Sequence, residues 1–160
     1  MDWLDRRHIA DLDPRAERAL RAAGQSFLND ALAEQYLAEA ADLAPEHPAV
    51  LIAHYRYHLY KHHYPEAEDF ARRCLAQVAA KLGLPSELLA TQSSHADFTS
   101  DDPLIRSWLY GMQALSYVVI RRGREAEGKA ILRKVIEVDP SDQTKTGILL
   151  TVIENAEPAD

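Results

Sequence analysis

Residues 123–140 read GREAEGKAILRKVIEVDP, which combines a glycine turn, an amphipathic segment and a closing proline. Small and apolar residues recur in it at steps of three and four, which is typical of one buried face of a helix. The residues on this face are Gly128, Leu132, Val135 and Ile136. Gly123 suits an interhelical turn, and Pro140 cannot continue a helix. The stretch therefore predicts the second helix of a helical hairpin.

The same pattern occurs twice earlier in the chain. The matching residues are Ala33, Leu37, Ala40 and Ala41, followed 34 residues later by Ala67, Ala71, Cys74 and Leu75. A fixed period of this length predicts stacked helical hairpins. The step from Ala67 to Gly128 is 61 residues, so 27 additional residues separate the second unit from the third.

Composition supports an all-helical chain. The 160 residues leave room for one domain with a sizeable core, and Ala and Leu dominate the 47% of residues that are hydrophobic. The net charge of −7 argues against a nucleic-acid partner, because phosphate contacts need clustered Lys and Arg. The single cysteine cannot form an internal disulfide, and we expect neither a signal peptide nor a membrane-spanning segment. A soluble, cytoplasmic protein is the simplest expectation.

Proline and capping residues predict where the helices begin. Asp13-Pro14 and Asp102-Pro103 are sound helix starts, because Asp can cap free amides and Pro suits the first helical position. We expect a single domain over residues 1–160, which also includes a short N-terminal helix within 2–12. Its parts are hairpins at about 14–47, 48–82 and 103–141, an insert at about 83–102, and a capping helix at about 142–156.

These patterns resemble the tetratricopeptide repeat family, over about two thirds of the chain. The resemblance implies an all-α, right-handed superhelix of three hairpins with a C-terminal capping helix, as in a small stand-alone bacterial-type member. At the position where the two helices of a repeat touch, the family carries a small residue, and Ser116 fits. Arg21 and Tyr55 stand there in the first two units, so these hairpins pack more loosely or the register is shifted by one residue.

The family binds extended peptides or helices in a concave groove lined by the first helix of each repeat. The groove positions carried over as partner-binding residues are Arg18, Arg56, Tyr60, Tyr110, Gln113, Tyr117 and Arg121, with Arg15 and Ile52 beside them. Arg and Tyr are enriched at binding hot spots, so the set suits an acidic or aromatic-containing partner segment. The alternative for each arginine is a solvated helix face, and for each tyrosine packing against the neighbouring hairpin.

A subclass of the family grips a C-terminal carboxylate with Asn and Lys in the groove. The corresponding positions here are Ala22, Ala53, Tyr110 and Ala114. We therefore do not expect that activity.

Two clusters carry residue types that suit chemistry. His54, His58 and His62 follow one another at steps of four, but the first and last point about 80° apart and no nearby acid or Cys completes a metal site. Ser93, Ser94, His95 and Asp97 have the residue types of a hydrolytic triad without its required convergence. Cys74 falls at a small core position. We expect no catalytic residue, metal or cofactor.

The leading hypothesis is a non-enzymatic protein-binding module, adaptor or chaperone-like, that holds a protein or peptide segment in a preformed groove. One alternative is a self-associating module whose homodimer interface contains Trp108, the long helix from residue 103 and the insert. Another is a protein that binds a divalent metal through the histidine stripe, with His54 and His58 as ligands.

Overall fold

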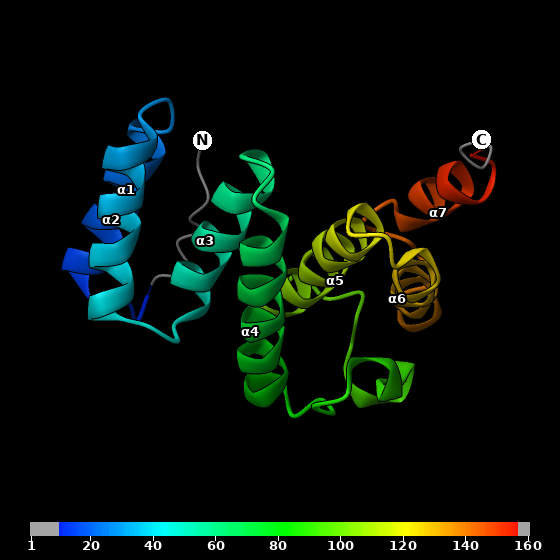
Figure 1. Cartoon of the computed structure of the whole chain (residues 1–160). Coiled ribbons are helices and arrows are strands. Elements are labelled where there is room, and N and C mark those ends of the chain that lie inside the picture. The colour runs from blue at the N-terminus through cyan, green and yellow to red at the C-terminus, as the bar shows by residue number, and fades with distance from the viewer. Residues whose placement is uncertain (1–9, 157–160) are drawn as a thin grey trace. The chain divides into compact units, whose positions relative to one another are not determined.

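The computed structural model describes residues 10–156, and this part of the chain is helical without strands (Figure 1). The predicted all-α class is therefore confirmed. The short N-terminal helix predicted within 2–12 lies mostly outside the described residues. The elements are α1 Pro14–Gln25, α2 Asp30–Leu43, α3 Pro48–Tyr60, α4 Tyr64–Leu82, the short 3-10 turns η1 Leu88–Ala90 and η2 Ser93–His95, α5 Pro103–Arg121, α6 Glu125–Val138 and α7 Thr146–Glu154.

The chain divides into two compact units, residues 1–78 and 79–160, and the division falls near the end of α4. Each unit is described by itself. The first holds α1, α2, α3 and most of α4, and the second holds η1, η2, α5, α6 and α7.

Local capping explains where the helices begin. The Asp13 carboxylate accepts a hydrogen bond from the Arg15 amide at 2.8 Å, and the Asp102 carboxylate accepts one from the Leu104 amide at 2.8 Å. Each cap is followed by a proline at the first helical position. The two starts predicted at Asp-Pro are thus confirmed, because this signal depends only on adjacent residues.

The first unit has a core of small residues. The buried members contributed by α1, α2 and α3 are Ala16, Ala19, Leu20, Ala23, Ala33, Leu37, Ala40, Ala49, Val50, Ala53 and Tyr57. Alanine at the contacts lets α1 and α2 approach closely along their length (Figure 1). Arg21 does not lie in this contact, because its side chain is exposed and pairs with Glu17 at 2.9 Å. Arg21 therefore does not occupy the position between the two helices that the resemblance assigned to it.

The 34-residue pattern corresponds to burial. The first three positions of the pattern are buried in each of its three occurrences: Ala33, Leu37 and Ala40 on α2, Ala67, Ala71 and Cys74 on α4, and Gly128, Leu132 and Val135 on α6. Residues that are equivalent in the sequence pattern are thus buried on α2, α4 and α6 alike.

The second unit is built on a close crossing of α5 and α6. Its buried apolar side chains are Ala79, Leu84, Phe98, Ile105, Trp108, Leu109, Met112, Leu115, Val118, Val119, Ile131, Leu132, Val135 and Val138. α5 and α4 each span 19 residues.

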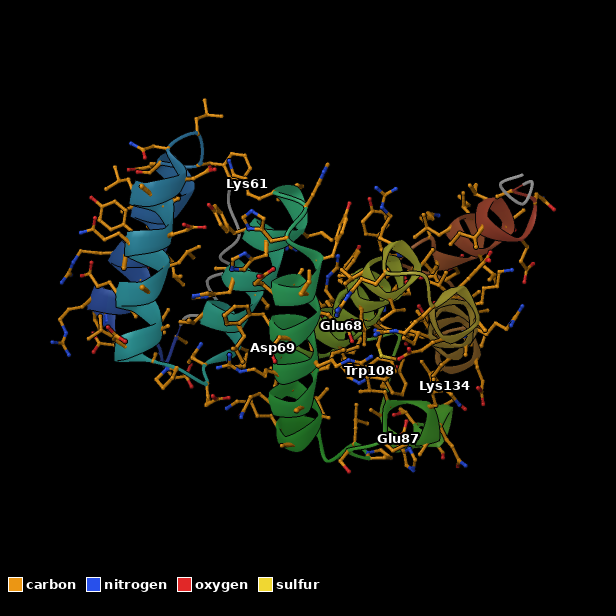
Figure 2. The ribbon with its side chains drawn as sticks, viewed as in Figure 1. Lys61, Glu68, Asp69, Glu87, Trp108 and Lys134 are labelled. Carbon is orange, nitrogen blue, oxygen red and sulfur yellow. The ribbon has the colours of Figure 1, made fainter. Side chains whose placement is uncertain are left out.

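The insert belongs to this core. η1 and η2 lie against α6. The Phe98 ring stands 5.3 Å, centroid to centroid, from the ring of Trp108; Trp108 is labelled in Figure 2. The Gln143 side-chain amide donates to the Phe98 carbonyl at 2.5 Å, across 45 residues of sequence. The insert also buries Thr91, so this mostly polar segment contributes two residues, Phe98 and Thr91, to the interior of the second unit.

Candidate functional site

The predicted partner-binding residues lie on three helices. Three of them lie in the first unit: Arg18 on α1, and Arg56 and Tyr60 on α3. The four on α5, in the second unit, are Tyr110, Gln113, Tyr117 and Arg121. The surfaces of the two units are therefore considered in turn.

In the first unit an open hollow of about 570 Å³ lies between α1 and α2. We call it the α1–α2 hollow. Its lining residues are Arg15, Arg18, Ala19, Ala22, Tyr36, Glu39, Asp42 and Leu43. Each helix contributes four lining residues, and within each helix these are spaced by one, three or four positions and so share one face. The hollow is therefore the groove between one face of α1 and one face of α2. Two of the residues expected at a binding groove, Arg15 and Arg18, lie together in it.

The two walls of the hollow carry opposite charge. Arg15 and Arg18 stand on α1, and Glu39 and Asp42 on α2. Arg15 is held by Asp13, whose carboxylate accepts from the guanidinium Nη2 at 2.8 Å, and this contact lowers the pKa of Asp13.

The other charges of the hollow are not used internally. Within residues 10–156, Arg18, Glu39 and Asp42 form no ion pair within 4.0 Å and no hydrogen bond through their side chains. These three charges therefore remain available to a bound molecule. The sequence indicated Arg18, but nothing in it indicated that two carboxylates of α2 would face the same hollow.

Arg56 and Tyr60 differ in their surroundings. Arg56 is half-buried and interacts with the hydroxyl of the buried Tyr55. Tyr60 is 52% exposed and packs edge-on against Phe27, with the ring centroids 6.1 Å apart. Of the two, Tyr60 has the side chain that a partner can contact directly.

A lysine joins the α1–α2 loop to the end of α3. Lys61 Nζ donates to the Phe27 carbonyl at 2.9 Å, pairs with Asp30 at 2.7 Å, and lies 4.2 Å from the centroid of the Phe27 ring (Figure 2). Cation–π and ionic contacts thus act on the same ammonium group. These three contacts of Lys61 hold the α1–α2 loop, which also carries the exposed Leu28.

The histidines serve packing in the first unit. His54 Nδ1 lies 2.8 Å from the Val50 carbonyl, and its ring packs on Phe70 at 4.5 Å. The His58 ring also stacks on Phe70, with the ring centroids 5.6 Å apart, and His58 Nδ1 lies 3.1 Å from His63 Nδ1. Burial lowers the pKa of both His54 and His58 and so favours neutral rings.

No group of three or more His, Cys, Asp or Glu side chains gathers in a metal-binding arrangement among the residues that the structure describes. The neutral His54 ring is engaged with the backbone one turn earlier in α3. The histidine stripe therefore has a structural explanation that needs no ion.

The other candidate reactive groups are also engaged locally. His95 Nδ1 accepts from the Gln92 amide at 2.9 Å, and the Asp97 carboxylate accepts from the Thr99 amide at 3.0 Å and hydroxyl at 2.6 Å. Cys74 is fully buried, and burial raises the pKa of its thiol to about 12. The thiol is thus protonated at neutral pH and is a poor nucleophile.

On α5 the predicted residues divide into internal and exposed groups. The Gln113 side-chain amide donates to the Thr144 carbonyl at 3.0 Å and to Thr146 Oγ1 at 3.1 Å, so it holds the start of α7. Tyr110 is half-buried with the Arg106 guanidinium 5.7 Å above its ring. Tyr117 is 46% exposed and Arg121 is exposed.

α7 is an unusually apolar helix for its exposure. Ile148, Leu149 and Val152 are 62%, 42% and 63% exposed, and Thr146 is the buried residue of the helix. Trp108, by contrast, is fully buried inside the second unit. Trp108 is therefore not available to the homodimer interface that was offered as an alternative, and the exposed apolar residues of this unit lie on α7 instead.

Helices long and apolar enough to cross a membrane are absent from the described residues. No family model and no solved structure matches the chain. One curated relative is the "Uncharacterized 19.8 kDa protein in nifW 5'region" of Azotobacter chroococcum mcd 1, which is 35% identical over 123 residues. The match covers 76% of this chain and 69% of the relative. The chain belongs to the family of this protein. The relative's name records a genomic position and no activity.

Proposed function

We propose that the protein is a non-enzymatic interaction module, adaptor or chaperone-like, built from three tetratricopeptide-like hairpins that hold a segment of a partner protein. The α1–α2 hollow carries this proposal. It contains Arg15 and Arg18, and it presents charges that the described part of the chain does not neutralise. Charged side chains that line a concave surface without internal partners are suited to recognition.

The recurrent burial of the second helices supports the repeat architecture. Ala33, Ala67 and Gly128 are equivalent in the sequence pattern and are all buried. Helical repeats of this kind leave an extended surface for binding, because each hairpin contacts only its neighbours. A cytoplasmic location is part of the proposal, since the single cysteine is a free, buried thiol.

A preformed hollow reduces the entropy lost on binding. Both walls are helices whose backbones are already hydrogen bonded, so the scaffold side orders little when a partner binds.

The experiment is affinity capture from the source organism with four forms of the protein. They are the wild type, Arg18→Glu, a double variant Tyr60→Ser with Tyr117→Ser, and Arg21→Glu as a control. Arg21 lies on the same helix as Arg18 but pairs with Glu17 outside the hollow.

We expect one specific partner to be lost from the Arg18 or tyrosine variants and kept by the control, with unchanged circular dichroism for all four. Identical capture profiles for all four folded proteins would remove the proposed binding role.

Self-association is a second candidate function, and the exposed apolar residues of α7 favour it. Light scattering of the wild type and of an Ile148→Glu, Val152→Glu variant distinguishes the two. A wild-type dimer that becomes a monomer in the variant supports self-association, and a monomer at all concentrations refutes it.

A further inference from the structure

We infer that the α1–α2 hollow binds an amphipathic helix of the partner, with one apolar stripe, one acidic edge and one basic edge. This inference rests on the proposed function and adds the chemistry of the partner to it. It depends on the shape, floor and charge of the hollow.

The shape of the hollow fits a helix. Its lining runs from Arg15 to Ala22 on α1 and from Tyr36 to Leu43 on α2. Each run covers about 10 Å at 1.5 Å per residue, which is two helical turns. Two adjacent helices form a groove into which the side-chain ridge of a third helix packs, and amphipathic helices bind proteins in such grooves.

The floor of the hollow is apolar. Ala19 and Ala22 leave room because their side chains are small, while the half-buried Tyr36 and Leu43 supply larger apolar contacts. The partner helix therefore needs apolar residues at steps of three and four. Small-molecule sites bury most of their ligand, whereas this hollow lies open at the surface, so a macromolecular segment fits it better.

The charges determine the edges of the partner helix. Arg18 stands on the α1 wall and the carboxylates of Glu39 and Asp42 on the α2 wall, and none is within 4.0 Å of an opposite charge in residues 10–156. An entirely acidic segment is repelled by the α2 wall, and an entirely basic segment by Arg18. A helix with both signs, one on each edge, satisfies both walls.

The test uses three synthetic helical peptides of about 20 residues that share one leucine stripe. The first has glutamates on one edge and lysines on the other, the second has glutamates on both edges, and the third has lysines on both. A helix can bind in either direction, so it does not matter which edge carries the glutamates. What matters is whether a peptide carries charges of both signs or of one sign. Affinity is measured by fluorescence anisotropy, and the binding surface by amide chemical-shift changes.

We expect the wild type to bind the two-sign peptide about tenfold more tightly than either single-sign peptide, a difference set by charge complementarity. Shift changes are expected at Ala22 and Leu43 in the hollow and not at Ile148 of α7.

The variants change the preference in opposite directions. Arg18→Glu places a carboxylate on the α1 wall, where the remaining Arg15 is already paired with Asp13, so the lysine peptide becomes the tightest ligand. Glu39→Lys together with Asp42→Lys makes both walls basic, so the glutamate peptide becomes the tightest. Arg21→Glu, the control outside the hollow, keeps the wild-type order. Arg18→Ala is a second variant should a charge reversal disturb folding, because the exposed Arg18 side chain forms no hydrogen bond or ion pair with residues 10–156; it should reduce the preference for the two-sign peptide.

Equal affinities for the three peptides, shift changes confined to α7, or no binding up to about 1 mM would overturn the inference. If the captured partner still depends on Tyr60 or Tyr117 in that case, the proposed function stands and only the hollow is wrong. If no variant affects capture, both fail.

Discussion

Gly128 of α6 lies directly against Ser116 of α5. A Cβ atom on residue 128 would stand 2.9 Å from the Ser116 carbonyl oxygen and 2.3 Å from Cγ1 of Ile120. The two helices approach this closely because residue 128 has no side chain. Ser116 is the residue that the sequence pattern placed at the contact between the helices of the third hairpin.

Gly128→Ala is therefore expected to destabilise the second unit by about 1–3 kcal/mol, the range for overpacking, despite the better helix propensity of alanine. Chemical denaturation measures the change. In an Ile120→Ala protein one of the two clashes is absent. Gly128→Ala should therefore lower the free energy of unfolding by less in that protein than in the wild type. A Gly128→Ala protein as stable as the wild type would mean that the helices are further apart than described.

Lys61→Met should loosen the α1–α2 loop. The substitution removes the hydrogen bond to Phe27, the ion pair with Asp30 and the cation–π contact. We expect the free energy of unfolding to fall by about 1–2 kcal/mol. Hydrogen exchange of the Asn29 amide, which bonds to the Ser26 carbonyl, reports the local effect. Lys81→Met, at an exposed position of α4, is the matched control and should change neither quantity.

The first unit should lose stability in mild acid. The pKa values of His54 and His58 lie below the ordinary 6.5, mainly because burial disfavours the charged rings. The unfolded chain therefore takes up protons at these residues before the folded chain does. Stability is unaffected above about pH 6.5 and declines as the pH falls from there toward the folded pKa values.

Urea unfolding at pH 7.5 and pH 5.5 measures this decline. A His54→Leu variant lacks one of the two groups and should show a smaller difference between the two pH values. A difference unchanged in both His54→Leu and His58→Gln would assign the acid sensitivity to other groups.

Gln113→Ala should release the start of α7. The variant leaves the Thr144 carbonyl and Thr146 hydroxyl without the amide that reaches them, which costs about 1–2 kcal/mol for groups that are buried. Faster hydrogen exchange in α7, with α1 to α3 unchanged, is the expected result. Tyr117→Ser, one turn along the same helix, should leave this exchange as it is. If Gln113→Ala weakens partner capture without affecting α7, Gln113 is a binding residue and not a structural one.

Helix type and most helix boundaries were predictable because their signals are local. Asp13-Pro14 and Asp102-Pro103 begin helices through side chains two residues from the amides they cap. The buried stripe of α6 follows from spacing within a single helix. The start of α7 was less predictable. Residues 142–145 form a turn in which the Asp142 carboxylate accepts from the Thr146 and Gly147 amides, and the helix begins only at Thr146.

The sequence by itself thus determined the all-helical class, the repeated buried face and Arg18 as a candidate for binding, since periodicity and capping act over a few residues. Only the tertiary structure decided which distant residues meet. Gln113 reaches Thr144, Phe98 of the insert packs on Trp108, and the carboxylates of α2 face the arginines of α1 across one hollow. Such contacts depend on how whole helices pack, and packing is set by the combined fit of many side chains and not by any one segment.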